Sequence, residues 1–271
     1  MAVFDFHFLS NILQAQVAVR MILPTFEHPE IPKMSSGDYY KPGMKYKTLW
    51  LLHGFGDDYT CWTRYTAIER YAQENKLMVI MPDARKSFYA DTQYGYPFWT
   101  FLTTELPDII KTNIRTYSDK REDNFIAGFS MGASGAMKYG INFPERFSQV
   151  YCLSGATMPI ETLKNFSDKT MKDITYIYGD VENIRGTCDD VYDIARQKVK
   201  EGHEMPTFHF AVGTDDSLIE IVRDGYKRLK DTGCETQLCE VQGYAHEWKF
   251  WNLYIRKVIY ELMPITGQPI Y

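Results

Sequence analysis

The sequence predicts an α/β fold in which a mostly parallel, twisted sheet is covered by helices on both faces. Its 271 residues, 45% of them hydrophobic, can form one large core, and α/β proteins of this size are often a single domain. The run 77–81 is continuously apolar, as expected for a parallel strand that is buried on both faces. A similar run at 47–52 precedes it, with a helical pattern at 62–75 between them. This order indicates a β-α-β unit.

The other elements follow from the same patterns. Alternating apolar and polar residues predict strands at 1–10 and 17–23, the second of them antiparallel, and a loop is expected at 25–45. A helix is expected at 98–114, with a kink at Pro107 because proline cannot donate the helical hydrogen bond. The remaining predicted elements are strands at 124–127, 150–153, 207–212 and 236–241, and helices at 133–142 and 248–262.

The segment between the strands at 150–153 and 207–212 is long, at about fifty residues, where a simple crossover needs fewer. We therefore expect a single domain over 1–271 with a small cap inserted at about 156–206. We expect this cap, together with segment 85–97, to select the substrate.

A serine motif lies between a predicted strand and a predicted helix. The sequence Gly128-Phe129-Ser130-Met131-Gly132 matches G-x-S-x-G, and strand, sharp turn and helix in this order form the nucleophile elbow of α/β-hydrolases. Glycine is needed at both ends because a side chain there would collide with the neighbouring strand or helix. The alternative interpretation is a simple turn ahead of a helix. The elbow predicts that Ser130 is a nucleophile.

A histidine near the C-terminus is placed to act as its base. His246 lies in a loop between the last predicted strand, 236–241, and the helix at 248–262. A loop at this position can carry the imidazole over the edge of the sheet to Ser130. Most single histidines are packing or surface residues, and the other candidates in this chain fit that description.

The acid is expected between these two residues. The strand at 207–212 is followed by Thr214-Asp215-Asp216-Ser217, and we choose Asp216, with Asp215 expected to cap the next helix. The order serine, aspartate, histidine is that of the α/β-hydrolases. Asp180 also closes an apolar run before His246 and stays an alternative, although a turn residue is the simpler interpretation.

The strand at 47–52 ends in His53-Gly54-Phe55-Gly56, an H-G-x-G loop of the type that supplies an oxyanion donor in lipases and esterases. The expected donors are the backbone N–H groups of Phe55 and Met131. His53 is expected to order the loop by hydrogen bonding. Each donor contributes on the order of 3 kcal/mol in the transition state.

With these motifs in place, the chain resembles the bacterial tributyrin esterases of the esterase D-like family, which are related to acetyl xylan and feruloyl esterases of carbohydrate esterase family 1. The resemblance implies an α/β-hydrolase fold with Ser130 as nucleophile, Asp216 as acid and His246 as base. Ala133 and Ser217 depart from the family pattern, and Ser217 puts the shape of the pocket near the acid in question. The matching stretches are 5–10, 51–54, 62, 81–83, 89–95, 105–107, 126–132, 213–216 and 246–251.

These residues predict a serine esterase that cleaves acetyl to butyryl esters through an acyl-enzyme, with a sugar or phenolic leaving group. Six charged residues of the cap, among them Asp189 and Asp193, are expected to form a solvated face. Residues expected to contact substrate are His53, Gly54, Tyr89, Gln93, Tyr94, Trp248 and Trp251. An acyltransferase, a thioesterase or a peptidase would use the same machinery. A binding module would be expected to have lost at least one of the three catalytic groups.

Composition narrows the partners further. A net charge of −5 argues against nucleic acid, and no apolar run is long enough for a membrane span. The five cysteines form no disulfide framework or metal-ligand spacing, so we expect no metal and no cofactor. Reduced thiols and the lack of a signal-peptide pattern predict a cytoplasmic enzyme. The expected partner is a small-molecule ester, and a homo-oligomer is left open.

Overall fold

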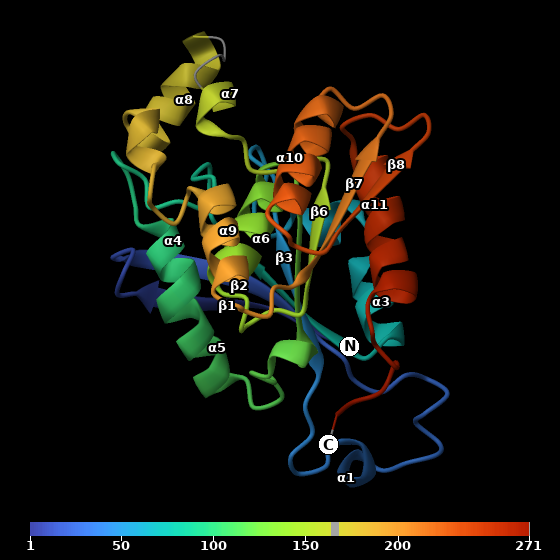
Figure 1. The fold of residues 1–271 in the computed structure, drawn as a ribbon. Coiled ribbons are helices and arrows are strands. Elements are labelled where there is room, and N and C mark those ends of the chain that lie inside the picture. Colours follow the sequence, from blue (N-terminus) through green and yellow to red (C-terminus); the bar gives the residue numbers. More distant parts are fainter. Residues whose placement is uncertain (164–167, 271) are drawn as a thin grey trace.

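The computed structural model describes residues 1–163 and 168–270 (Figure 1). Within these ranges one eight-stranded sheet has the order β1-β2-β4-β3-β5-β6-β7-β8. The strands from β4 to β8 run parallel, and the hairpin of β1 and β2 is added in antiparallel fashion at one edge. The strands are β1 (Ala2–Ser10), β2 (Ala15–Leu23), β3 (Lys47–Leu52), β4 (Leu77–Pro82), β5 (Asn124–Phe129), β6 (Gln149–Leu153), β7 (Thr207–Gly213) and β8 (Thr236–Val241).

Helices cover both faces of this sheet, so the fold is that of an α/β-hydrolase (Figure 1). One apolar core involves α5, α6, α9 and α10, and the other involves α2, α3 and α11. The helices are α1 (Ser36–Tyr39), α2 (Cys61–Tyr65), α3 (Ile68–Glu74), α4 (Phe98–Thr100), α5 (Leu106–Asn113), α6 (Met131–Asn142), α7 (Ile160–Leu163), α8 (Asp168–Tyr178), α9 (Val191–Lys200), α10 (Ile219–Asp231) and α11 (Trp248–Lys257). Shorter 3-10 turns are η2 (Arg121–Asp123) and η3 (Val181–Ile184), and π turns are η1 (Phe101–Glu105) and η4 (Val258–Leu262).

The predicted strands are all present, but two predicted helices are interrupted. The helix expected at 62–75 is divided into α2 and α3, because the backbone of Thr66 is extended and its hydroxyl accepts a hydrogen bond from the Ile68 amide. The helix expected at 98–114 contains the π turn η1 just before Pro107. The helical N–H that proline lacks would have pointed toward the carbonyl of Thr103, and this carbonyl accepts a hydrogen bond from Arg146 instead.

The predicted cap segment, residues 156–206, contains α7, α8, η3 and α9. In Figure 1, α7 and α8 lie above the top of the sheet. Buried side chains of α7, α8 and η3 form a small apolar cluster of their own, whereas those of α9 belong to one of the two main cores. Residues 164–167 of the predicted cap lie outside the described residues. The described helices include none with the length and apolar character that a membrane span requires.

The β5–α6 junction brings backbone against backbone. A Cβ at Gly128 would overlap the carbonyl group of Gly132, four residues further along the turn. A Cβ at Gly132 would lie 2.6 Å from the carbonyl oxygen of Leu52 in β3. Glycine at both positions therefore allows α6 to start directly above β3 and β5, as the sequence pattern predicts.

We expect Gly128→Ala to lower the free energy of unfolding by about 3 kcal/mol, because the added methyl group overlaps backbone that cannot move aside. Gly56→Ala is the matched control, since no heavy atom lies within 4 Å of its added Cβ. Its effect should stay within about 0.5 kcal/mol. Urea denaturation followed by circular dichroism measures both, and equal effects of the two changes would contradict this account of the junction.

Candidate active site

Ser130 occupies the turn between β5 and α6. Its backbone has φ of 54° and ψ of −121°, a conformation that a non-glycine residue rarely adopts. The amide of Ser130 donates to the carbonyl of Leu153 in β6, which holds the turn against the sheet. The side chain is partly accessible although its neighbours are buried. The sharp turn thus presents the hydroxyl at the carboxyl edge of the parallel strands.

His246 reaches this hydroxyl from the loop between β8 and α11. Its Nε2 lies 3.1 Å from Ser130 Oγ, and its Nδ1 lies 3.0 Å from Asp216 Oδ2. The indole ring of Trp251 meets the imidazole edge to face, with ring centroids 5.0 Å apart. The structure therefore brings Ser130, His246 and Asp216 into one hydrogen-bonded line.

The carboxylate of Asp216 is fully buried and held on several sides. Besides His246 it accepts a hydrogen bond from the Leu218 amide at 2.8 Å and one from Ser154. Burial alone raises the pKa of Asp216, but these hydrogen bonds, that of His246 foremost, outweigh it and the pKa lies below its ordinary value. The group is therefore ionised at neutral pH and can orient the imidazole with its proton on Nδ1.

The two other aspartates that were considered have different positions. Asp215 is predicted to cap α10, but this prediction is wrong. Asp215 accepts a hydrogen bond from the hydroxyl of Thr214, and it is Asp216 that accepts one from the amide of Leu218, just before α10. The reason is that the oxygens of Asp216 can serve both His246 and that amide. Asp180 begins the turn η3 and accepts a hydrogen bond from the Glu182 amide, which is the turn role.

His53 orders the loop after β3 and is only 1% exposed. Its Nε2 accepts the Ala84 amide at 2.9 Å, which places the proton on Nδ1, where it faces the carbonyl of Gly54 at 2.8 Å. This arrangement supports the loop that carries Phe55. Met131 is the first residue of α6, so its amide has no partner within the helix. Phe55 and Met131 both line the cavity at Ser130.

A cavity of about 300 Å³ opens at Ser130. Phe55, Phe88 and Met131 line it near the serine, and apolar residues of the cap such as Met158, Ile174 and Ile184 line it further away. Most of its wall is apolar, but Lys138 and Asp189 lie at the end formed by α6 and the cap. The cap therefore supplies much of the surface that a bound molecule would meet.

Several residues expected to contact substrate are placed elsewhere. Tyr89 is 1% exposed, and its hydroxyl donates to the carbonyl of His53, so it is a packing residue beneath the loop. Gly54 is buried because Phe129 lies directly against it. His53 is buried as well, and none of these three residues lines the cavity.

The two tryptophans also lie apart from this cavity. Trp248 packs against Trp62 and Tyr65, and Trp251 stacks on Phe129 at 4.2 Å between ring centroids. Neither lines the cavity, although both are predicted to contact substrate.

Gln93 and Tyr94 are exposed on a loop that is tied to the cap. Their amides donate to the carbonyls of Ile177 and Tyr176 at the end of α8. They are therefore available on the surface beside the cap, although they do not line the cavity.

Sequence reasoning missed four residues of the site. Ser154 is buried and connects Asp216 with the indole N–H of Trp251, which donates to its hydroxyl at 3.0 Å. Ser134, Lys138 and Asp189 line the cavity, so Asp189 does not belong to the solvated face expected for the cap. Ser134 and Lys138 follow Ser130 at intervals of four residues, which places all three on one side of α6. A lysine in an otherwise apolar helix was a signal that could have found them.

The described ranges contain no group of three or more histidine, cysteine, aspartate or glutamate side chains that could hold a metal ion. All five cysteines are free. What the arrangement offers chemically is a hydroxyl, a base oriented by a carboxylate, and a neighbouring helix N-terminus.

Comparison with known proteins agrees with this geometry. The sequence model of a family described as "Putative esterase" matches residues 37–256. An acetyl esterase of Caldicellulosiruptor saccharolyticus is 28% identical over 261 residues, which cover 94% of this chain and 96% of that protein.

Two solved structures from Staphylococcus aureus are similar throughout. A substrate-bound, fluorophosphonate-binding serine hydrolase has a TM-score of 0.81 at 29% identity, with 95% of this chain and 96% of that chain covered. An S-formylglutathione hydrolase has a TM-score of 0.79 at 29% identity, with 95% and 97% covered.

Proposed function

The chain belongs to the putative esterase family, and from this premise we propose that it cleaves short-chain acyl esters with Ser130, His246 and Asp216 as its catalytic triad. Its class is that of the carboxylic ester hydrolases with serine chemistry. The observation that carries the triad is the continuous hydrogen-bonded line from Ser130 Oγ through both imidazole nitrogens to the buried carboxylate.

In the proposed mechanism, His246 Nε2 takes the proton of Ser130 as its oxygen attacks the ester carbonyl. Asp216 keeps the imidazole oriented and stabilises its charged form. The amides of Phe55 and Met131 hold the oxyanion of the tetrahedral intermediate. The alcohol leaves with the proton from His246, and water then repeats the sequence on the acyl-enzyme.

The proposed substrate is small. A cavity of about 300 Å³ lies at the lower end of the range for ligand pockets and is mostly apolar near the serine. This supports an acetyl to butyryl acyl group. We propose a sugar or phenolic alcohol group because exposed polar and aromatic side chains, Gln93, Tyr94 and Tyr96, lie on the loop beside the cap.

The remaining parts of the proposal concern organisation and location. We propose that residues 156–206 act as a cap on a single domain, since their side chains line much of the cavity. We propose the cytoplasm as the location, because five free thiols suit a reducing compartment. The proposed partner is the ester substrate, and self-association stays a prediction.

A thioester is the second substrate class to consider, because one of the similar structures is named an S-formylglutathione hydrolase. The same serine chemistry cleaves both kinds of acyl bond. Rates on an acetyl thioester and on the oxygen ester of the matching alcohol compare the two classes directly.

We expect Ser130→Ala to reduce turnover of p-nitrophenyl acetate by on the order of 10⁶ while the protein stays folded. The change removes a partly accessible oxygen and leaves the packing of the elbow unchanged. The variant should also lose covalent labelling by a fluorophosphonate probe. Turnover well above background in a folded variant would rule out Ser130 as the nucleophile.

Asp216→Asn should lower kcat by on the order of 10⁴, because an amide favours the wrong imidazole tautomer. Asp180→Asn is the matched control and should act near the wild-type rate, since asparagine can also accept the Glu182 amide. Steady-state rates with p-nitrophenyl acetate measure both. A reversed result would mean that the cap supplies the acid.

Acetyl to butyryl esters should be cleaved much faster than decanoyl and longer esters. Each methylene that fits the cavity adds roughly 0.8 kcal/mol of binding, so the best chain length reports the depth of the cavity. A series of p-nitrophenyl esters measures kcat/KM against chain length. A maximum at decanoyl or beyond, with acetate poorly used, would argue for a lipase instead.

A further inference from the structure

The cavity at Ser130 contains a buried ion pair at the end away from the serine. Lys138 of α6 and Asp189 of the cap both line the cavity, with side chains 3% and 16% exposed, and Nζ lies 2.7 Å from Oδ1. A buried lysine is costly unless it is paired. We call this part of the cavity, formed by Lys138, Asp189 and Tyr178, the charged end.

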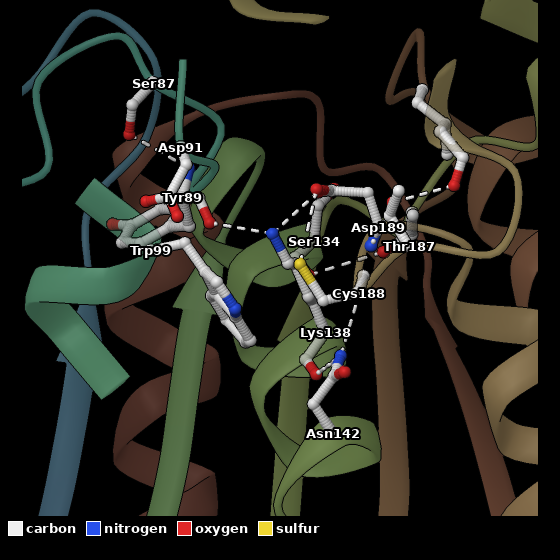
Figure 2. A network of polar contacts seen from close by, with 12 residues as sticks. Ser87, Tyr89, Asp91, Trp99, Ser134, Lys138, Asn142, Thr187, Cys188 and Asp189 are labelled. Carbon is white, nitrogen blue, oxygen red and sulfur yellow. Dashed lines mark hydrogen bonds and ion pairs between the residues drawn. The ribbon is translucent and has the colours of Figure 1, made fainter. Parts of the chain in front are cut away.

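Most of the hydrogen-bonding capacity of the lysine is used within the protein. Its ammonium donates to Asp189 and to the carbonyl of Tyr89 at 3.1 Å, and it lies 4.0 Å from the ring centroid of Trp99. Figure 2 shows Lys138 pointing from α6 toward Tyr89 and Asp189, with Trp99 beside it. Two of the three hydrogens of the ammonium group are therefore donated to protein oxygens, and the ring of Trp99 lies beside the cation.

The aspartate, in contrast, has an oxygen to spare. Oδ1 accepts the hydrogen bond from Lys138. The neighbour of Oδ2 is the Cys188 thiol at 3.6 Å, which is a weak donor. Ser134 offers a further acceptor, because its hydroxyl already donates to the Ala156 carbonyl at 2.8 Å.

Tyr178 supplies a group of the opposite kind. Its hydroxyl can donate, and burial first, and then the charge of Asp189, raises the pKa of Tyr178 well above its ordinary value. The phenol is therefore protonated. Tyr178 and Asp189 both line the cavity, so it offers a donor as well as an acceptor.

We propose that the charged end binds a neutral hydroxyl group of the substrate, which donates to Asp189 and accepts from Tyr178. The inference rests on the proposed esterase function and names its substrate class as short esters that carry a free hydroxyl a few bonds from the ester. Lys138 follows Ser130, the residue just before α6, by eight residues, which is about 12 Å along the helix axis, and the lysine side chain leans back toward Ser130. The hydroxyl must therefore lie several bonds from the ester, as in butanediol monoacetate, to cover the part of this distance that the lysine side chain does not.

Other groups fit less well. A carboxylate would face the carboxylate of Asp189, and two hydrogens of Lys138 are already donated to protein oxygens. An ammonium group would meet an aspartate whose charge is already neutralised, and Asp173, which also lines the cavity, is exposed to water. An alkyl chain would remove water from Asp189 without replacing its hydrogen bond.

The experiment compares esters that differ by one hydroxyl. On the alcohol side, the monoacetates of ethanediol, propanediol and butanediol are measured against ethyl, propyl and butyl acetate. On the acyl side, methyl hydroxybutanoate is measured against methyl butanoate. In at least one series we expect wild-type kcat/KM to favour the hydroxylated ester by roughly tenfold or more, as a hydrogen bond to a charged group would.

Three variants then locate this preference. Asp189→Asn and Tyr178→Phe should each reduce it, and Lys138→Met combined with Asp189→Leu should reverse it, because an apolar pair of similar volume makes that end suit an alkyl chain. Asp193→Asn is the matched control: it is an exposed aspartate of α9 paired with Arg196, and it should leave the preference unchanged.

Thermal unfolding of each variant separates recognition from a structural link between α6 and the cap. A purely structural pair would change the melting temperature and leave the hydroxyl preference at its wild-type value, which would overturn the proposal. Absence of any preference in the wild type would overturn it too, while turnover of p-nitrophenyl acetate would still support the esterase function. Persistent activity of Ser130→Ala would instead remove the proposed function itself.

Discussion

The close approach of β3, β5 and α6 is the constraint on which the site depends. Backbone meets backbone at Gly128 and Gly132, and Ser130 between them is held in a rare conformation. If the helix were displaced to accommodate a side chain, the hydroxyl and the amide of Met131 would both move. The packing of the sheet thus determines where the proposed nucleophile and a proposed oxyanion donor lie.

The parallel direction of the strands then assembles the rest. Ser130 and His246 are 116 residues apart, and Asp216 and His246 are 30 apart, yet each follows a strand at the same edge of the sheet. This is why the order of the elements and the positions of Ser130, Asp216 and His246 could be predicted from sequence. Strands, turn glycines and loop residues can be recognised from local sequence patterns. The parallel arrangement of the strands then brings the residues that follow them close together.

Other features depend on contacts that no local pattern contains. Tyr89 is predicted to contact substrate through its hydroxyl, but this hydroxyl donates to the carbonyl of His53. Lys138 is paired with Asp189, 51 residues away, in a segment whose charges suggested a solvated face. In the π turn before Pro107, the carbonyl of Thr103 likewise has a partner distant in sequence, the guanidinium of Arg146. In each case a partner distant in sequence decides the role.

The proposed cap, residues 156–206, lies at one place in the order of the strands. It leaves the sheet after β6 and returns at β7, so it is one continuous insertion between neighbouring strands. Ser130, Asp216 and His246 are all outside it, whereas Met158, Ile174, Ile184 and Asp189 are inside it. Substitutions in this one stretch of chain can therefore reshape the far wall of the cavity while the distances among the three side chains of the proposed triad stay fixed. Because the residues that line the far wall and the proposed triad lie in different parts of the chain, the substrate range can change, in nature or by engineering, while the triad stays the same.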